Sequence, residues 1–218
     1  GIQDAGENGL NGVTVILTDE NNVTQTTTTA NHPITTAPGY YVFEDLVPGE
    51  YSLNFTLPSG YQFSPIDAGS PNDDSSDSDA DLLSGSTVIT HLISGENDMT
   101  WDAGVVPLVS IGDRVWIDID NNGVQDTGEA DFPGVTVNLL NSSGTQATRD
   151  DGSLIPDTTT DANGLYSFTG LRPGSYEVQF TLPNGSIFTT RRASGSNANN
   201  DSDAIESGAN KGRTEVTV

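Results

Sequence analysis

The sequence predicts an all-β protein made of two tandem β-sandwiches, and three observations support this prediction. In several short segments, apolar and polar residues alternate with a period of two, which is typical of strands that bury one face. Turns that contain glycine or proline separate these segments. No stretch keeps the apolar spacing of a capped amphipathic helix, so we expect almost no helix.

An internal repeat in the sequence sets the number of domains. The recurring pairs are Gly1–Glu7 with Gly123–Glu129, Leu10–Leu17 with Phe132–Leu139, Pro38–Tyr51 with Asn163–Tyr176, Phe55–Pro58 with Phe180–Pro183, and Asp77–Ala80 with Asp201–Ala204. A repeat of this length indicates two copies of one domain rather than a solenoid of small units. We expect a first copy over residues 1–106 that lacks its first strand. The second copy, residues 107–218, is expected to lack its last strand.

The alternating segments of each copy are the expected strands. They are Val13–Leu17 and Val135–Leu139, Tyr41–Phe43 and Tyr166–Phe168, Tyr51–Phe55 and Tyr176–Phe180, and the unpaired Thr87–Ile93, Met99–Val105, Ile111–Asp118 and Thr214–Val218. The turns at Pro48-Gly49 and Pro173-Gly174 predict hairpins between the aromatic strands that flank them. Because the aromatic residues alternate with polar ones, we expect them in the core rather than on a sugar-binding surface.

The stretch from Asp118 to Glu129 has the ligand spacing of a twelve-residue calcium loop. Its expected ligands are Asp118, Asp120, Asn122, the backbone carbonyl of Val124, Asp126 and Glu129. Ca²⁺ prefers six to eight oxygen ligands in a flexible cage, and the glycine after Asn122 permits the sharp turn that such a loop needs. The sequence therefore predicts a Ca²⁺ site here. In the first copy, only Asp4 and Glu7 of this pattern are present.

A second acidic region follows in each copy. Residues 67–81 are rich in Asp, and their counterparts lie within residues 197–206. Both copies keep an Asp-x-Asp pair. The pairs are Asp77 with Asp79 and Asp201 with Asp203. This retention between diverged copies predicts a second cation site, with a flexible acidic loop as the alternative.

Charge and composition narrow the range of partners and compartments. Seven Lys and Arg stand against 31 Asp and Glu, a formal net charge of −24, which repels nucleic acid and anionic membranes. The absence of cysteine excludes disulfides and thiolate metal sites. No apolar run is long enough to cross a bilayer. Calcium loops without flanking helices suit an exterior with abundant free Ca²⁺, so we expect an extracellular protein, at the cell surface or secreted.

The motifs in combination resemble those of a known family. They are Ile111–Glu129, Pro133–Val137 and Thr160–Tyr176. Together they are similar to the B-type repeat domains of serine-aspartate repeat adhesins. The resemblance implies an immunoglobulin-like or prealbumin-like β-sandwich, arrayed as a stalk on bacterial surface or secreted proteins. It also implies several Ca²⁺ ions per domain that make the array rigid, with the acidic residues named above as ligands.

Three classes of function are compatible with these features to different degrees. A calcium-stiffened structural repeat of a stalk or fibre has neighbouring repeats as partners, and the loop at 118–129 is expected to fix the joint between copies. An adhesion module that binds a host protein or glycan is the alternative. An enzyme is not expected, because His32 and His91 lack a nucleophile partner and the carboxylates have metal-ligand spacing. The absent strands come either from the same polypeptide or from a neighbouring chain.

Overall fold

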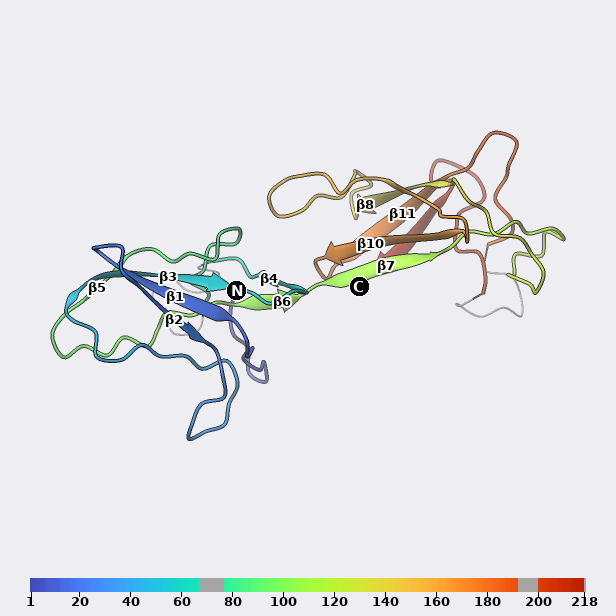
Figure 1. Ribbon diagram of the computed structural model, residues 1–218. Coiled ribbons are helices and arrows are strands. Elements are labelled where there is room, and N and C mark those ends of the chain that lie inside the picture. Colours follow the sequence, from blue (N-terminus) through green and yellow to red (C-terminus); the bar gives the residue numbers. More distant parts are fainter. Residues whose placement is uncertain (67–76, 192–199, 218) are drawn as a thin grey trace. The chain divides into compact units, whose positions relative to one another are not determined.

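The protein consists of two compact all-β units, Gly1–Pro107 (unit 1) and Leu108–Val218 (unit 2). The structure is a computed structural model, and it describes residues 1–66, 77–191 and 200–217 (Figure 1). Residues 67–76 and 192–199, which hold parts of both acidic regions, lie outside the described residues. No helix occurs in the described part of the chain, so the all-β prediction is confirmed. Accordingly, none of the described segments is a helix that would span a membrane.

Unit 1 contains a four-stranded sheet and a two-stranded sheet, both antiparallel. The larger sheet has the order β2-β1-β3-β5 and the smaller pairs β4 with β6. The bounds are β1 Thr14–Asp19, β2 Thr24–Thr28, β3 Gly49–Thr56, β4 Tyr61–Phe63, β5 Thr90–Leu92 and β6 Val105–Pro107. Strand β6 therefore covers the edge offered by β4, with Tyr61 opposite Pro107 and Phe63 opposite Val105.

Unit 2 has the same four-stranded framework but a different small sheet. The order β12-β11-β8-β9 forms the larger sheet, and β10 pairs with β7 in the smaller one. The bounds are β7 Val109–Arg114, β8 Thr136–Asn141, β9 Thr158–Thr159, β10 Leu165–Leu171, β11 Ser175–Thr181 and β12 Arg213–Thr217. The opening strand β7 thus lies against β10, with Ile111 opposite Phe168.

The core of unit 2 lies between its two sheets. Ile111 and Phe168 contribute from the smaller sheet, and the fully buried Val137 and Val178 contribute from the larger one. The period-two alternation produces this arrangement, because alternate residues of a strand point to the same face. The core of unit 1 is built from the corresponding positions. Both units are therefore β-sandwiches, and the aromatic residues pack inward as predicted.

Several expectations about the strands are wrong. Of the expected strand Met99–Val105, only Val105 belongs to a strand, β6. Tyr41–Phe43 is not a strand, although the corresponding part of β10 is one. The expected hairpins are also absent from the described residues, because β10 and β11 belong to different sheets. The turns at Pro48 and Pro173 instead carry the chain from one layer to the other.

A tyrosine fixes each of these crossing turns. Tyr51 donates its hydroxyl to the carbonyl of Val47 over 2.7 Å, and Tyr176 donates to that of Arg172 over 2.9 Å. Each hydroxyl thus binds a carbonyl four residues earlier, which holds the turn where the chain changes layer. Alternation alone identifies strands but does not say which strands are neighbours, so the crossing could not be predicted from it.

Candidate metal centre

The predicted calcium loop begins just beyond β7 and returns alongside the same segment. A hydrogen bond of 2.8 Å from the Ile117 amide to the Ala130 carbonyl closes its base. Trp116 and Asp131, the residues just outside Ile117 and Ala130, form an isolated antiparallel bridge. Gly123 has a φ of 79°, a conformation that favours glycine, so it supplies the sharp turn expected of it.

Three carboxylates of the loop lie close together. Ligand oxygens of Asp118, Asp120 and Glu129 are all within 4.8 Å of one another. Asp126, the other carboxylate of the expected set, accepts a hydrogen bond of 2.8 Å from the Nδ2 of Asn122. The Oδ1 of Asn122 accepts from the Val124 amide over 2.6 Å. All these groups offer oxygen atoms, which is the donor set that a hard cation such as Ca²⁺ prefers.

Asp118 is the most constrained of these carboxylates. Its Oδ2 accepts hydrogen bonds from the Gly123 amide, at 2.8 Å, and from the hydroxyl of Thr189. Burial alone would raise the pKa of Asp118, but these bonds outweigh it and lower the pKa below its usual value. Thr189 is a functional candidate that sequence reasoning missed. It lies 71 residues from Asp118, and no spacing rule connects the two.

Glu129 closes the loop through both of its carboxylate oxygens. Oε1 accepts from the Ile119 amide over 2.9 Å, and Oε2 accepts from the Asp126 amide over 3.0 Å. Unit 1 keeps the second of these contacts, since Glu7 Oε2 accepts from the Asp4 amide over 3.0 Å. Asp4 and Glu7 therefore have the same local geometry as Asp126 and Glu129.

The second acidic region lies against the predicted calcium loop. Val124 pairs with Asp201 in an antiparallel bridge, and the Ser202 amide donates to the Gly123 carbonyl over 3.1 Å. Unit 1 repeats this pairing, with Ile2 opposite Asp77. The two regions that the sequence presents as separate sites are thus adjacent in both units.

Asp77 and Asp201 share an unusual environment. In each residue the Oδ1 atom is buried and has no hydrogen-bond partner among the described residues. Asp77 as a whole is 6% exposed. Burying an unpaired carboxylate oxygen is costly unless a positive charge compensates it. These oxygens therefore fit a cation ligand better than they fit a structural hydrogen-bonding role.

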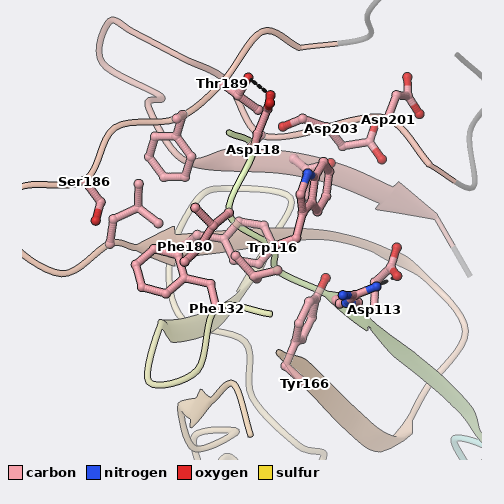
Figure 2. A pocket seen from close by; sticks show the side chains of 18 of the residues that line it. Asp113, Trp116, Asp118, Phe132, Tyr166, Phe180, Ser186, Thr189, Asp201 and Asp203 are labelled. Carbon is pink, nitrogen blue, oxygen red and sulfur yellow. Dashed lines mark hydrogen bonds between the residues drawn. The ribbon is translucent and has the colours of Figure 1, made fainter. Parts of the chain in front are cut away.

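The partner residues of the two Asp-x-Asp pairs differ in exposure. Asp79 is buried, and its Oδ2 accepts a hydrogen bond of 2.8 Å from the Asp102 amide. Asp203 is exposed and stands at the rim of a cavity in unit 2 (Figure 2). The second members of the two pairs therefore differ in environment. Asp79 is buried and accepts a backbone hydrogen bond, whereas Asp203 is exposed.

The cavity in unit 2 has a volume of about 730 Å³ and lies between the two acidic segments and the sandwich core. Phe132, Tyr166 and Phe180 line its apolar side, while Asp118, Asp201 and Asp203 stand at its rim, as Figure 2 shows. Burial raises the pKa of Tyr166, and the charges of Asp113 and Asp203 raise it further. The hydroxyl of Tyr166 is therefore held in its protonated, hydrogen-bond-donating form.

Comparison with known proteins identifies the family. The model of the SdrD B-like domain matches residues 1–105 and 109–218. The chain belongs to the SdrD B-like domain family. The resemblance inferred from the sequence motifs is thereby confirmed.

The relatives of this SdrD B-like chain are much longer proteins. It is 39% identical over 188 residues to serine-aspartate repeat-containing protein D of Staphylococcus aureus strain Newman, which covers 85% of this chain and 13% of that protein. It is 36% identical over 220 residues to serine-aspartate repeat-containing protein F of Staphylococcus epidermidis, covering 100% of this chain and 12% of that protein. The chain thus spans about an eighth of the relatives it matches.

Two solved structures are distant likenesses of this SdrD B-like chain. A minor pilin of Streptococcus agalactiae matches with a TM-score of 0.31 and 14% identity, over 96% of this chain and 78% of the pilin. The major pilin subunit of Bacillus cereus matches with a TM-score of 0.31 and 10% identity, over 98% and 92% of the two chains. Neither likeness is close enough to assign a role to any residue.

Proposed function

We propose that these two SdrD B-like domains are structural repeats of an extracellular protein, at the cell surface or secreted, that Ca²⁺ stiffens. The main support for the proposal is that two segments with many carboxylate and amide oxygens lie next to each other in unit 2. The carboxylates of Asp118, Asp120 and Glu129 lie together, and the Val124–Asp201 bridge joins their loop to a segment with a buried, unpartnered oxygen.

The loop residues would hold the ion with oxygen atoms only. Asp118, Asp120 and Glu129 supply clustered carboxylates, and Asn122, Val124 and Asp126 complete the expected set. A bound divalent cation supplies the positive charge that offsets repulsion among these groups. The chain's own contribution is to hold the carboxylates in position, through the amides of Gly123, Ile119 and Asp126.

The acidic character of the whole chain supports the same proposal. A net charge of −24 destabilises compact units through self-repulsion, and cations bound at several sites would reduce it. Asp77 and Asp79 in unit 1, and Asp201 and Asp203 in unit 2, are the residues we assign to further ligation. The proposal includes the joint between repeats, because the 118–129 loop follows the opening strand of unit 2 in the sequence. Its partners are neighbouring repeats of the same protein, in a stalk or fibre.

Calorimetric unfolding with Ca²⁺ and with EDTA tests the proposal. Each site that binds only the folded form adds about 2.7 kcal/mol to the free energy of unfolding when free Ca²⁺ is a hundredfold above its Kd. We expect EDTA to lower the melting temperature of both units. Glu129→Gln should abolish most of the Ca²⁺ effect in unit 2, and the matched variant Glu7→Gln should leave unit 2 unchanged. Superimposable melting curves in Ca²⁺ and EDTA would refute the proposal.

A further inference from the structure

The larger sheet of unit 1 ends on one side in the strand β2 (Figure 1). Among the described residues, no strand pairs with the far side of β2. The Thr29 amide donates to the Val13 carbonyl over 2.9 Å, which fixes the residues of this segment that face β1. Because alternate residues of an antiparallel ladder bond the same partner, the backbone groups of Thr24, Thr26 and Thr28 face the free side. The free side of β2 thus presents a row of N–H and C=O groups that can pair with another strand.

Neither the opening nor the closing strand of a unit belongs beside β2. In unit 2 the opening strand β7 pairs with β10, in the smaller sheet. In unit 1 the closing strand β6 pairs with β4, also in the smaller sheet. The strand of unit 2 that corresponds to β2 is β9, and it is likewise the outermost strand of its sheet. The free side of β2 is therefore a property of the domain and not of the segments that precede or follow it.

The other outer strands of the two larger sheets are protected against pairing. β9 has two residues and β5 has three, and very short edge strands offer few backbone groups. β12 carries Arg213, which forms an ion pair with Glu177, and charged residues are a common protection of sheet edges. β2 has five residues, none of them charged or proline, and it keeps a regular register with β1. It lacks each of these protections.

A long neutral segment surrounds β2. Residues 21–43 contain no Asp, Glu, Lys or Arg, although the chain has 31 acidic residues. The neighbouring residues on the solvent face of β1 are also uncharged, and they are Thr14, Ile16 and Thr18. Two chains that each carry a net charge of −24 repel one another. The region around β2 is therefore where two copies can approach with little repulsion.

We propose that β2 pairs antiparallel with β2 of a second copy of this chain, about a two-fold axis at Thr26. Thr26 then lies opposite Thr26 of the second copy, and Thr24 lies opposite Thr28. This register joins the backbone groups that face the free side, and it places no like charges opposite one another. The same surface is used by both copies, as in other two-fold symmetric dimers. The inference goes beyond the proposed function, because it joins two chains side by side through residues that are not assigned to Ca²⁺.

The pairing is short, and this sets its expected strength. The free side extends over β2 only, because Ala30 just beyond it pairs with Tyr40. Interfaces of this size are weak and transient. We therefore expect a dimer that forms reversibly at high protein concentration.

Sedimentation velocity of the whole chain, at about 20 µM to about 1 mM protein, tests the proposal. Salt at about 0.15 M screens the general repulsion beyond about 8 Å. We expect a reversible monomer–dimer equilibrium. Thr26→Asp places two carboxylates opposite each other on the two-fold axis and should weaken the dimer at least about tenfold. The matched control Thr159→Asp adds the same charge at the exposed outer strand of unit 2 and should leave the dimer unchanged.

Cysteine cross-linking tests the register. The chain has no cysteine, so Thr26→Cys introduces a single thiol. In the proposed dimer the two Cα atoms at this position are about 5.5 Å apart, a separation that a disulfide spans. Glutathione disulfide should therefore oxidise the two thiols to one intermolecular disulfide, and it is itself reduced to two glutathione thiols. The control Thr24→Cys lies on the same face of β2 but about 14 Å from its counterpart, so it should cross-link at least about tenfold more slowly.

Three results would overturn the inference. These are a chain that stays monomeric up to about 1 mM, equal effects of Thr26→Asp and Thr159→Asp, and equal cross-linking rates of the two cysteine variants. A monomeric chain would leave the free side of β2 to a partner other than a second copy. Repeating the sedimentation in Ca²⁺ and in EDTA keeps the two proposals apart, since the dimer should form in both. A dimer without a Ca²⁺-dependent melting shift contradicts only the proposed function, and a melting shift without a dimer contradicts only the pairing.

Discussion

The two units carry the same sequence pattern but have different edges. In unit 1 the edge beside Tyr61–Phe63 is covered by β6, while Tyr41–Phe43 is not a strand. In unit 2 the corresponding residues of Tyr41–Phe43 belong to the seven-residue strand β10, which pairs with β7. The segment at Ser186–Phe188 is not a strand there. In both units, the edge segment is a strand where a neighbouring strand pairs with it, as β4 pairs with β6 and β10 with β7.

The segments Gly1–Glu7 and Asp118–Glu129 provide a second comparison between the units. Gly1–Glu7 corresponds to only the second half of the loop, yet it pairs with the segment at Asp77 as the full loop pairs with Asp201. The Ser78 amide donates to the Gly1 carbonyl over 2.8 Å, as Ser202 does to Gly123. The same backbone pairing therefore occurs in both units, at Asp77 and at Asp201. The residues Asp118–Asn122 add clustered charge to a framework that both units share.

Replacing Trp101 with alanine tests whether the segment that leads into β6 holds the edge of unit 1. We expect this substitution to lower stability the most. The substitution removes the anchor of the segment that covers the edge of unit 1, and we expect a loss of about 2–3 kcal/mol of unfolding free energy for this half-buried residue. Amide hydrogen exchange measured by mass spectrometry should show faster exchange in unit 1 only. Ile89→Ala is the control, since Ile89 is 67% exposed. Equal protection in the Trp101 variant and the parent would show that the segment does not hold the edge.

A smaller effect is expected from Thr189→Val in Ca²⁺-free buffer. The change removes the hydroxyl that donates to Asp118 and keeps the side-chain shape, so unit 2 should lose about 0.5–1.5 kcal/mol. Urea unfolding followed by tryptophan fluorescence measures it, with the exposed Thr190→Val as control. If Thr190→Val destabilises unit 2 as much as Thr189→Val does, the contact with Asp118 contributes nothing.

The pH dependence of the Thr189 variant has a definite sign. Because the folded-state pKa of Asp118 lies below its usual value, its contribution to stability is present above the ordinary Asp pKa of about 3.9. That contribution is lost as the pH falls through the lower folded-state value. The difference between parent and Thr189→Val should therefore narrow in acid. A difference that stays constant from neutral to acid pH would contradict the role given to this hydrogen bond.

Much of the fold followed from residues close together in the sequence. The buried alternation of Val13–Leu17 and Val135–Leu139 predicted β1 and β8, and the spacing from Asp118 to Glu129 predicted the carboxylate cluster. Contacts between distant segments carried no such signal. The Thr189–Asp118 bond and the Val124–Asp201 bridge exist only because the sandwich brings separate loops together. The wrongly predicted hairpins have the same origin, since strand order is a property of the whole domain.

The most direct test of the account is a Ca²⁺ titration of the ¹⁵N-labelled chain, observed at the backbone amides of Gly123 and Ser202. These amides lie in the two segments that the structure joins, since Ser202 donates to the Gly123 carbonyl and Gly123 donates to Asp118. Both signals are expected to shift together and saturate, and neither should do so in Glu129→Gln. Signals that stay unchanged up to millimolar Ca²⁺ in the parent chain would contradict it.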